Sequence, residues 1–158
     1  MKTITEITRQ KPTPPQIRLA AYCRVSSDSS DQLHSFAAQI KYYSEYCKRH
    51  PEYKFVDIYA DEGVTGTSME KRDDFRRMLR DCKKGLIDRI IVKSMSRFAR
   101  NTEEMLTALR ALEQMEVSVY FEEQGLDTRS MNSEMFATFP GMIAQQESIS
   151  ISQNMRWS

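Results

Sequence analysis

The first apolar run of the chain ends in the octapeptide Ala20-Ala21-Tyr22-Cys23-Arg24-Val25-Ser26-Ser27, and the whole run predicts a strand over residues 17–25. Successive side chains of a strand point to opposite faces. One face of this strand would be the apolar one, made by Leu19, Ala21, Cys23 and Val25. The opposite face would carry Tyr22, Arg24 and Ser26.

Ser26 stands where the apolar run gives way to the polar residues 27–31. Arg24 would point the same way as Ser26, roughly 6–7 Å back along the strand. A hydroxyl group beside a fixed cation at the carboxyl end of a strand is placed to attack a negatively charged group. The alternative is a serine that hydrogen-bonds within a turn, and the octapeptide alone favours that alternative.

The length, composition and net charge of the chain are those of an ordinary globular protein. The 158 residues suit one domain, and 28% charged with 40% hydrophobic residues is typical of soluble proteins. A net charge of +1 does not by itself indicate a nucleic-acid partner. The chain has 3 cysteines and no closely spaced pair, so we expect buried free thiols in a reducing compartment. It has neither an apolar run of about 18 residues nor a secretory signal, so we expect no membrane span.

Strand and helix patterns alternate along the chain. Strands are expected over residues 17–25, 54–60, 88–93 and 117–122, and helices over residues 33–49, 72–84 and 101–115. The run Ile90-Ile91-Val92 lacks alternation, which predicts a central strand covered on both faces. Gly85 is expected to end the second helix, and Asn101 with Glu104 is spaced like a capping box at the start of the third. This order predicts an α/β fold with a mostly parallel sheet of four to five strands and helices on both faces. Ligands of such sheets bind beyond the carboxyl ends of the strands, where Ser26, Asp61 and Ser96-Arg97 are expected to converge.

The chain divides into three parts. Residues 1–16 are expected to form a flexible leader and residues 17–130 the α/β domain. Residues 131–158 have helical spacing, broken or kinked at Pro140-Gly141, which predicts the start of a long helix that continues past Ser158.

Arg97-Phe98-Ala99-Arg100 is the second feature with a chemical implication. If the segment is helical, its two guanidinium groups share a face and can hold a phosphate, while Phe98 anchors the turn in the core. The alternative is a solvated basic turn that pairs with Glu103 and Glu104, and these four residues alone favour it.

Three further residues have both a functional and an ordinary interpretation. Arg72 can add a cation to the same site or lie on the surface. Asp61 can orient an arginine or accept a proton, or it can cap a turn or helix. Gln39 can reach a polar loop group or be exposed. No histidine triad and no metal-ligand spacing is present. If the chain acts on phosphate, arginines would have to do the work that metals do in other proteins.

Five blocks in this order resemble the serine site-specific recombinases, the resolvase/invertase family. Residues 22–27 resemble its Y-x-R-V-S-[ST] signature. The other blocks are Phe36-Ala37-Ala38-Gln39, Asp61 with the glycine segment up to Arg72, Ser96-Arg97-Phe98-Ala99-Arg100-Asn101, and Ala144-Gln145-Gln146-Glu147. The resemblance spans residues 18–147, and residues 27–34 and 61–68 are more similar to the large serine recombinases, the integrases and transposases of mobile elements.

The resemblance implies a DNA recombinase, with residues 17–130 as its catalytic domain and residues 131–158 as the start of a long helix that contacts DNA and other subunits. Ser26 would attack a DNA phosphodiester and form a 5′-phosphoserine intermediate, followed by strand exchange and rejoining. The implied catalytic residues are Ser26, Arg24, Arg72, Arg97, Arg100, Asp61 and Gln39, of which Arg72, Arg97 and Arg100 would contact DNA. The family needs no cofactor and no metal, acts as a homodimer or tetramer on DNA, and would work in the cytoplasm at the prokaryotic nucleoid.

Two departures and two rival functions accompany the resemblance. Ser96 stands where the family often has aspartate, and Glu147-Ser148-Ile149-Ser150 lacks the arginines that many relatives carry there. One rival is a catalytically inactive dimerisation or regulatory module of the same fold, against which the intact Ser26 and its arginines argue. The other is an enzyme acting on small phosphate compounds, which the absence of a nucleotide-binding loop disfavours.

Overall fold

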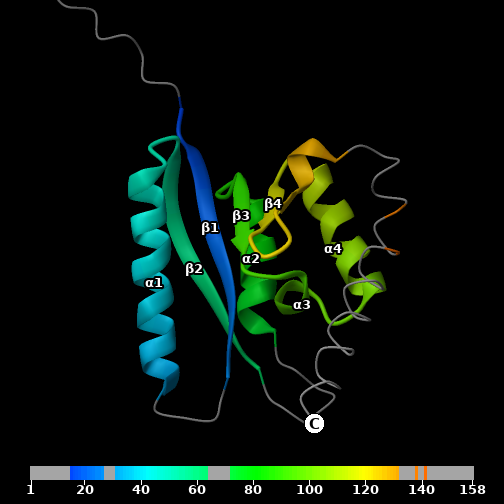
Figure 1. The fold of residues 1–158 in the computed structure, drawn as a ribbon. Coiled ribbons are helices and arrows are strands. Elements are labelled where there is room, and N and C mark those ends of the chain that lie inside the picture. The colour runs from blue at the N-terminus through cyan, green and yellow to red at the C-terminus, as the bar shows by residue number, and fades with distance from the viewer. Residues whose placement is uncertain (1–14, 27–30, 64–71, 132–137, 139–140, 142–158) are drawn as a thin grey trace, which may run out of the picture.

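The computed structural model describes residues 15–26, 31–63 and 72–131, together with positions 138 and 141. Its elements are β1 (Ile17–Ser26), α1 (Asp31–Arg49), β2 (Tyr53–Gly63), α2 (Asp73–Lys83), β3 (Arg89–Val92), α3 (Met95–Phe98), α4 (Thr102–Gln114), β4 (Ser118–Phe121), β5 (Leu126–Asp127) and the 3₁₀ turn η1 (Thr128–Ser130). The strands form one sheet in the order β2-β1-β3-β4-β5 (Figure 1). Strands β1 to β4 run parallel, and β5 pairs antiparallel with β4.

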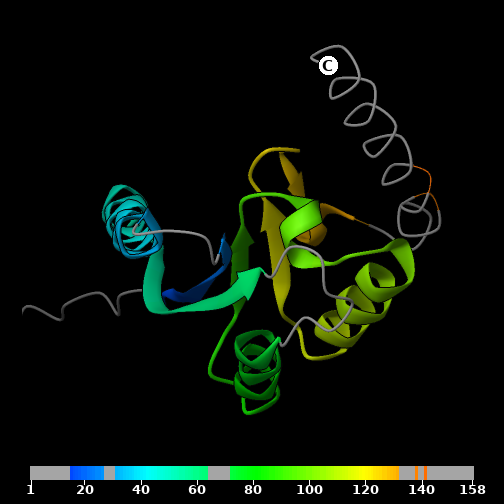
Figure 2. The same ribbon diagram turned by 90° about the horizontal axis from the view of Figure 1, so that it is seen from below.

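Helices cover both faces of this sheet. α1 lies over β1 and β2 on one face, and α2 and α4 lie on the opposite face (Figure 2). The predicted fold class is therefore confirmed. Nearly all of the expected leader and of the expected long helix lies outside the described residues, so those boundaries stay predictions. No helix in the described part of the chain is long and apolar enough to cross a lipid bilayer.

β1 is buried on both faces, although its alternation predicted one polar face. The α1 side carries the expected core residues Leu19, Ala21 and Cys23. Tyr22, on the opposite side, is also fully buried. An inner strand of a sheet that helices cover on both sides has no solvent face, so its tyrosine becomes part of the core.

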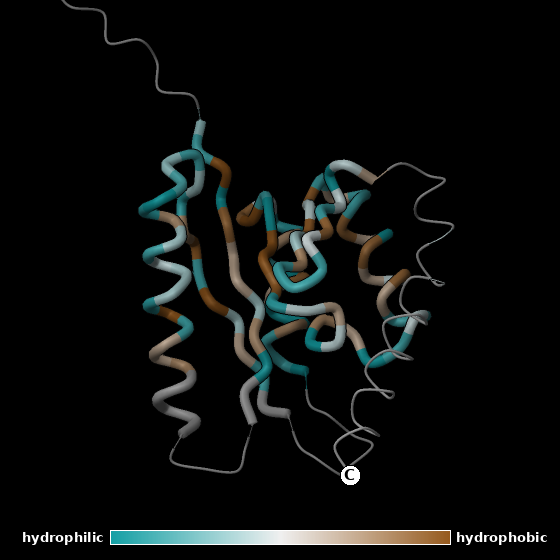
Figure 3. The backbone as a smooth tube through the Cα atoms, viewed as in Figure 1, coloured by the Kyte–Doolittle hydropathy of each residue, from teal (hydrophilic) through white to brown (hydrophobic). Residues whose placement is uncertain are grey.

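The central position predicted for the Ile90-Ile91-Val92 run is confirmed. β3 lies between β1 and β4, and all of its residues are buried. Hydrophobic residues concentrate along these inner strands, whereas α1 is hydrophilic over much of its length (Figure 3). Phe98 is fully buried, as expected, with its ring edge-on to Phe75 and Phe121 at centroid distances of 5.2 and 5.6 Å. The Phe98 side chain thereby fixes α3 to the core near the edge of the sheet.

Two helix ends predicted from the sequence also form as expected. Gly85 follows α2 with φ +76°, a conformation that costs glycine little. The amides of Gly85 and Leu86 donate to the last carbonyl groups of the helix, at 3.0 Å each. At the start of α4, the side chain of Asn101 accepts the backbone N–H of Glu104 at 2.8 Å.

The condition under which Arg97 and Arg100 would share a helix face is not met. α3 ends at Phe98, and Ala99 is extended, with φ −144° and ψ 151°. The reason lies in the next helix, because a residue that caps a helix N-terminus must itself be extended. Asn101 has φ −147° and ψ 169°, so α3 and α4 cannot be one continuous helix.

All three cysteines are free thiols, as predicted. Cys23 is buried on the α1 side of the sheet and Cys82 on the α2 side, while Cys47 is half-buried. Burial raises the pKa of Cys23 to about 12, against a smaller lowering by the nearby Arg97, and burial likewise raises the pKa of Cys82 to about 12.

A buried arginine fixes the amino end of β3. Nη1 and Nη2 of Arg89 donate to the two carboxylate oxygens of Asp127 at 2.9 and 2.8 Å, and Nη1 also donates to the Ser118 hydroxyl at 3.1 Å. The guanidinium lies 5.9 Å from the ring centroid of Tyr53 and 5.4 Å from that of Tyr120. This pair ties β5 and η1 to the sheet, away from the carboxyl ends of the parallel strands.

Candidate active site

The parallel pairing of β1 and β2 aligns the residues at their carboxyl ends. Arg24 lies opposite Asp61, and the backbone of Ser26 lies opposite Gly63. α3 begins three residues after the end of β3, so Arg97 follows the same edge of the sheet. These positions meet at one sheet edge because parallel strands all point their carboxyl ends the same way.

Arg97 is bound directly to the strand that carries Ser26. Its Nη1 donates to the backbone carbonyl oxygen of Arg24 at 3.0 Å. Both arginines are half-buried, so each keeps part of its surface in contact with solvent. Arg97 therefore contacts β1 at a position two residues before Ser26.

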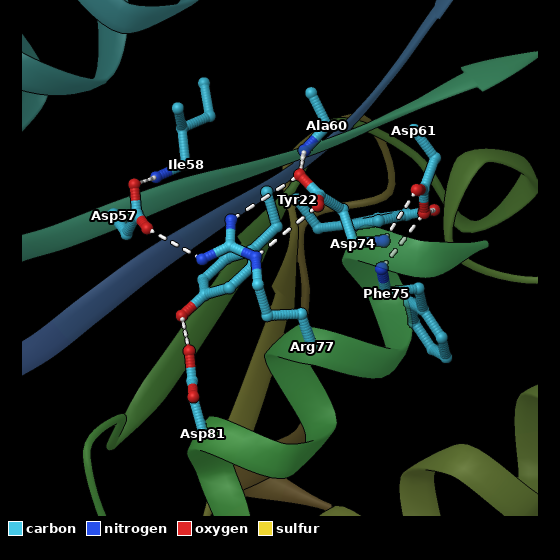
Figure 4. Close-up of polar contacts among 10 residues, drawn as sticks. Tyr22, Asp57, Ile58, Ala60, Asp61, Asp74, Phe75, Arg77 and Asp81 are labelled. Carbon is cyan, nitrogen blue, oxygen red and sulfur yellow. Dashed lines mark hydrogen bonds and ion pairs between the residues drawn. The ribbon is translucent and has the colours of Figure 1, made fainter.

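Asp61 is buried at the end of β2 and caps α2 from outside that helix. Its carboxylate accepts the backbone N–H groups of Asp74 at 2.8 Å and Phe75 at 3.0 Å (Figure 4). The position that precedes α2 supplies no side-chain cap of its own. Asp61 therefore satisfies donors of the first turn and places a negative charge at the positive end of the helix dipole.

Tyr22 joins Asp61 to the arginine that precedes α2. Its hydroxyl donates to Asp61 at 2.8 Å and accepts from Nη2 of Arg72 at 3.3 Å. Burial raises the pKa of Tyr22 well above its ordinary value, so the hydroxyl keeps its proton and the direction of the bond to Asp61 is fixed.

Arg72 is buried, contrary to its interpretation as a surface residue. Its side chain is 7% exposed, and its guanidinium carbon lies 3.8 Å from the centroid of the Phe75 ring. Nη2 also donates to the carbonyl oxygen of Phe98, and Nη1 donates to the carboxylate of Glu104. These contacts link the start of α2 to β1, α3 and α4.

The other predicted residues lie further out. Arg100 is exposed after the end of α3, with its backbone N–H 3.4 Å from Oε2 of Glu104. Ser96 is exposed, and its hydroxyl lies 3.1 Å from that of the buried Ser94. Gln39 is half-buried on α1, on the opposite side of the sheet from Arg72.

Two groups of predicted residues therefore emerge. One pairs Arg97 with the Arg24 backbone, and the other connects Asp61 to Arg72 through Tyr22. Sequence reasoning missed Tyr22 as the connecting residue. Its membership of the same strand face as Arg24 was the available signal. The partner of Arg72, Glu104, was considered only as a cap and as a neighbour of the basic turn.

The described residues contain no group of three or more histidine, cysteine, aspartate or glutamate side chains arranged to hold a metal ion. The polar groups at the sheet edge are instead arginine donors, serine hydroxyls and one buried carboxylate. Such a set can bind and stabilise an anion.

Known proteins are similar to this chain in sequence and in fold. Residues 19–158 match the resolvase N-terminal domain. A resolvase/recombinase of Pseudomonas putida is 26% identical over 135 residues, covering 85% of this chain and 67% of that protein.

Solved structures give the same result. A resolvase family site-specific recombinase from Streptococcus pneumoniae superposes with a TM-score of 0.63 and 29% identity, over 89% of this chain and 95% of that one. The N-terminal catalytic domain of TP901-1 integrase has the same fold, with a TM-score of 0.62, 22% identity, and coverage of 83% of this chain and 96% of that one. The resemblance to serine recombinases is thereby confirmed, and the chain belongs to the family of resolvase N-terminal domains.

Proposed function

We propose that this domain cuts and rejoins DNA through Ser26. The hydroxyl oxygen of Ser26 attacks the phosphorus of a DNA phosphodiester, the bond to the 3′ oxygen breaks, and a 5′-phosphoserine linkage forms. The serine proton leaves to solvent or a base, and the departing 3′ oxygen takes up a proton. One phosphodiester replaces another, so the intermediate conserves the bond energy and a 3′-hydroxyl can reverse the step without a nucleotide cofactor.

One observation carries this proposal above the others. Ser26 occupies the carboxyl end of β1, and Arg97 is bound to that strand through the carbonyl oxygen of Arg24. Together with membership of the resolvase family, this supports Ser26 as the nucleophile and both arginines as stabilisers of the negative charge that grows on the phosphate. Arg100, exposed two residues after the end of α3, is the third cation of the proposed set.

The remaining residues have supporting roles in the proposal. Asp61 holds the start of α2 and, through Tyr22, the guanidinium of Arg72. Gln39, together with Asp61, helps to hold the arrangement of the site. DNA is the substrate, and a homodimer or tetramer of this protein acts in the complex that brings two DNA sites together. The expected location is the cytoplasm, at the nucleoid.

The test uses a nicked suicide DNA substrate that carries the recombination site. We expect a covalent protein–DNA adduct that is stable to denaturation and absent from Ser26→Ala. Ser27→Ala is the matched control, because it removes the same hydroxyl one residue later and should still form the adduct. An adduct in Ser26→Ala that disappears in Ser27→Ala would transfer the nucleophile to Ser27, and no adduct in any variant would favour the inactive module.

Metal removal tests the role assigned to the arginines. If guanidinium groups supply the charge stabilisation, EDTA should leave the rate of adduct formation unchanged at constant ionic strength. The measurement is a time course of the adduct with EDTA and with added Mg²⁺. Loss of cleavage in EDTA and its return with Mg²⁺ would refute the metal-independent mechanism.

A further inference from the structure

The carboxylate of Glu104 lies between two nitrogen donors that come from different parts of the chain. Nη1 of Arg72 donates to Oε1, and the backbone N–H of Arg100 lies 3.4 Å from Oε2. Glu104 belongs to the first turn of α4, a helix of 13 residues that Asn101 caps. The two donors and the positive end of this helix form what we call the anion seat.

These donors are the kind that bind phosphate groups in proteins. A guanidinium offers directed, charge-assisted hydrogen bonds to phosphate oxygens, and a backbone N–H near a helix N-terminus adds a further donor in a favourable field. A carboxylate and a phosphodiester each carry one negative charge. Exchange of one for the other at Arg72 therefore preserves the charge balance around a buried cation, which makes it far less costly than leaving that cation unpaired.

The exposed fractions of Arg72 and Glu104 show from which side a phosphate must replace the carboxylate. The side chain of Arg72 is 7% exposed, while that of Glu104 is 33% exposed. Nη2 of Arg72 is already bound to Tyr22 and Phe98, so Nη1 is the part of the guanidinium that points into the seat. Nε of Arg72 is buried without a hydrogen-bond partner among the described residues. The arginine is thus less completely satisfied than is usual for a buried cation.

We propose that Glu104 is an internal occupant of the anion seat and that a DNA phosphate replaces it when its side chain turns outward. The proposal rests on the function proposed above, because the basic residues beside the seat are those assigned to the DNA phosphate. Glu104 keeps Arg72 paired in the free protein and competes with the phosphate for Nη1. It is a positioning and inhibitory residue, and it does not touch the reacting atoms.

Substitution of Glu104 should therefore improve phosphate binding. Glu104→Gln keeps an acceptor oxygen but removes the competing charge, and we expect about fivefold tighter binding of inorganic phosphate, in the range of a partly exposed ion pair. Glu103→Gln is the matched control, since it removes the same charge from an exposed neighbour in the same helical turn. Its effect should stay below about twofold.

The measurement is an NMR titration of this chain with inorganic phosphate against chloride at constant ionic strength, followed at the backbone amide of Arg100. Equal phosphate affinities of Glu104→Gln and Glu103→Gln, or an Arg100 amide that does not respond, would overturn the proposal. If Glu104→Gln fails to fold, Glu104→Asp decides the question. Its shorter side chain withdraws from Nη1, so phosphate should bind more tightly than in the unsubstituted chain, and equal or weaker binding overturns the proposal.

A second titration distinguishes DNA from free phosphate and separates this proposal from the catalytic one. Ser26→Ala protein carrying either Glu104→Gln or Glu103→Gln is titrated with a short DNA duplex, so that no cleavage intervenes. Tighter DNA binding only with Glu104→Gln supports exchange with the DNA backbone. Tighter phosphate binding without tighter DNA binding refutes it. Neither readout depends on whether Ser26 forms an adduct.

Discussion

Two arginines that are buried in the described part of the chain, Arg72 and Arg89, lie toward opposite ends of the sheet and are satisfied in different ways. Arg89 engages both oxygens of Asp127, and that carboxylate also accepts the backbone and side chain of Arg129. Arg72 engages one oxygen of Glu104, a carbonyl and a hydroxyl, and leaves Nε unpartnered among the described residues. Arg89 lies where β3 begins, and Arg72 lies toward the end where ligands of parallel sheets bind. A closed ion pair stabilises the fold, whereas an incompletely satisfied arginine is available for exchange.

The largest expected effect breaks the closed pair. Arg89→Met leaves the carboxylate of Asp127 with less compensation, and we expect the free energy of unfolding to fall by about 3 kcal/mol in urea denaturation. Cleavage per folded molecule should not change, because Arg89 is remote from the proposed site. Arg18→Met is the control, because the Arg18–Asp88 pair has side chains that are 40% exposed on both partners and should cost under about 1 kcal/mol. Equal losses in the two variants would contradict the structural role of Arg89.

The second prediction concerns the arginine at the ligand-binding edge. Arg97→Ala should slow DNA cleavage by a factor of about 100 or more, since it removes charge stabilisation from the transition state. The melting temperature should change little, because the side chain is half-buried and makes one hydrogen bond to a carbonyl oxygen. Arg110→Ala, on the exposed side of α4, controls for the general loss of positive charge. A near-normal cleavage rate in Arg97→Ala would remove this residue from the site.

The smallest effect is a pH dependence of the Arg89–Asp127 pair. Burial acts to raise the pKa of Asp127, but the hydrogen bonds from Arg89 and Arg129 outweigh it and hold the pKa at about 2. A carboxylate whose pKa is lower in the folded protein contributes stability above its unfolded pKa and loses it as the pH falls through the folded pKa. Asp127 should therefore contribute about 2 kcal/mol at neutral pH, lost between about pH 4 and pH 2.

Urea denaturation of the unsubstituted chain and of Asp127→Asn at several pH values measures this term. The difference in unfolding free energy between them should shrink as the pH falls through that range. A difference that stays constant down to pH 2 would show that the charge of Asp127 is not what stabilises the pair.

The fold was predictable because each of its determinants is local. The apolar run of β3, the glycine after α2 and the asparagine before α4 each act through residues within one or two turns. The same cap predicted a new helix at Asn101 and thereby conflicted with a shared helix face for Arg97 and Arg100. Arg97 and Arg100 do not share a helix face, because the cap determines where the next helix begins.

The site was less predictable because its contacts join residues far apart in the sequence. Arg72 stands in a charged run that is typical of a surface, and its burial depends on Tyr22, 50 residues earlier, and Glu104, 32 residues later. Asp61 caps a helix that begins 12 residues after it, which no local pattern indicates. The roles of Ser26 and the surrounding arginines in catalysis stay predictions, because they depend on the DNA as well as on the fold.

Two buried thiols lie on opposite sides of the sheet, so the reaction of each with a thiol reagent measures the local opening of its own side. Alkylating reagents react with the thiolate, which is scarce at neutral pH at both Cys23 and Cys82 because burial raises their pKa to about 12. The rate of labelling of Cys23 would measure how fast α1 separates from the sheet, and the rate of labelling of Cys82 how fast α2 does so. The same labelling in the presence of DNA would show which of the two helices separates from the sheet first and which one stays packed against it.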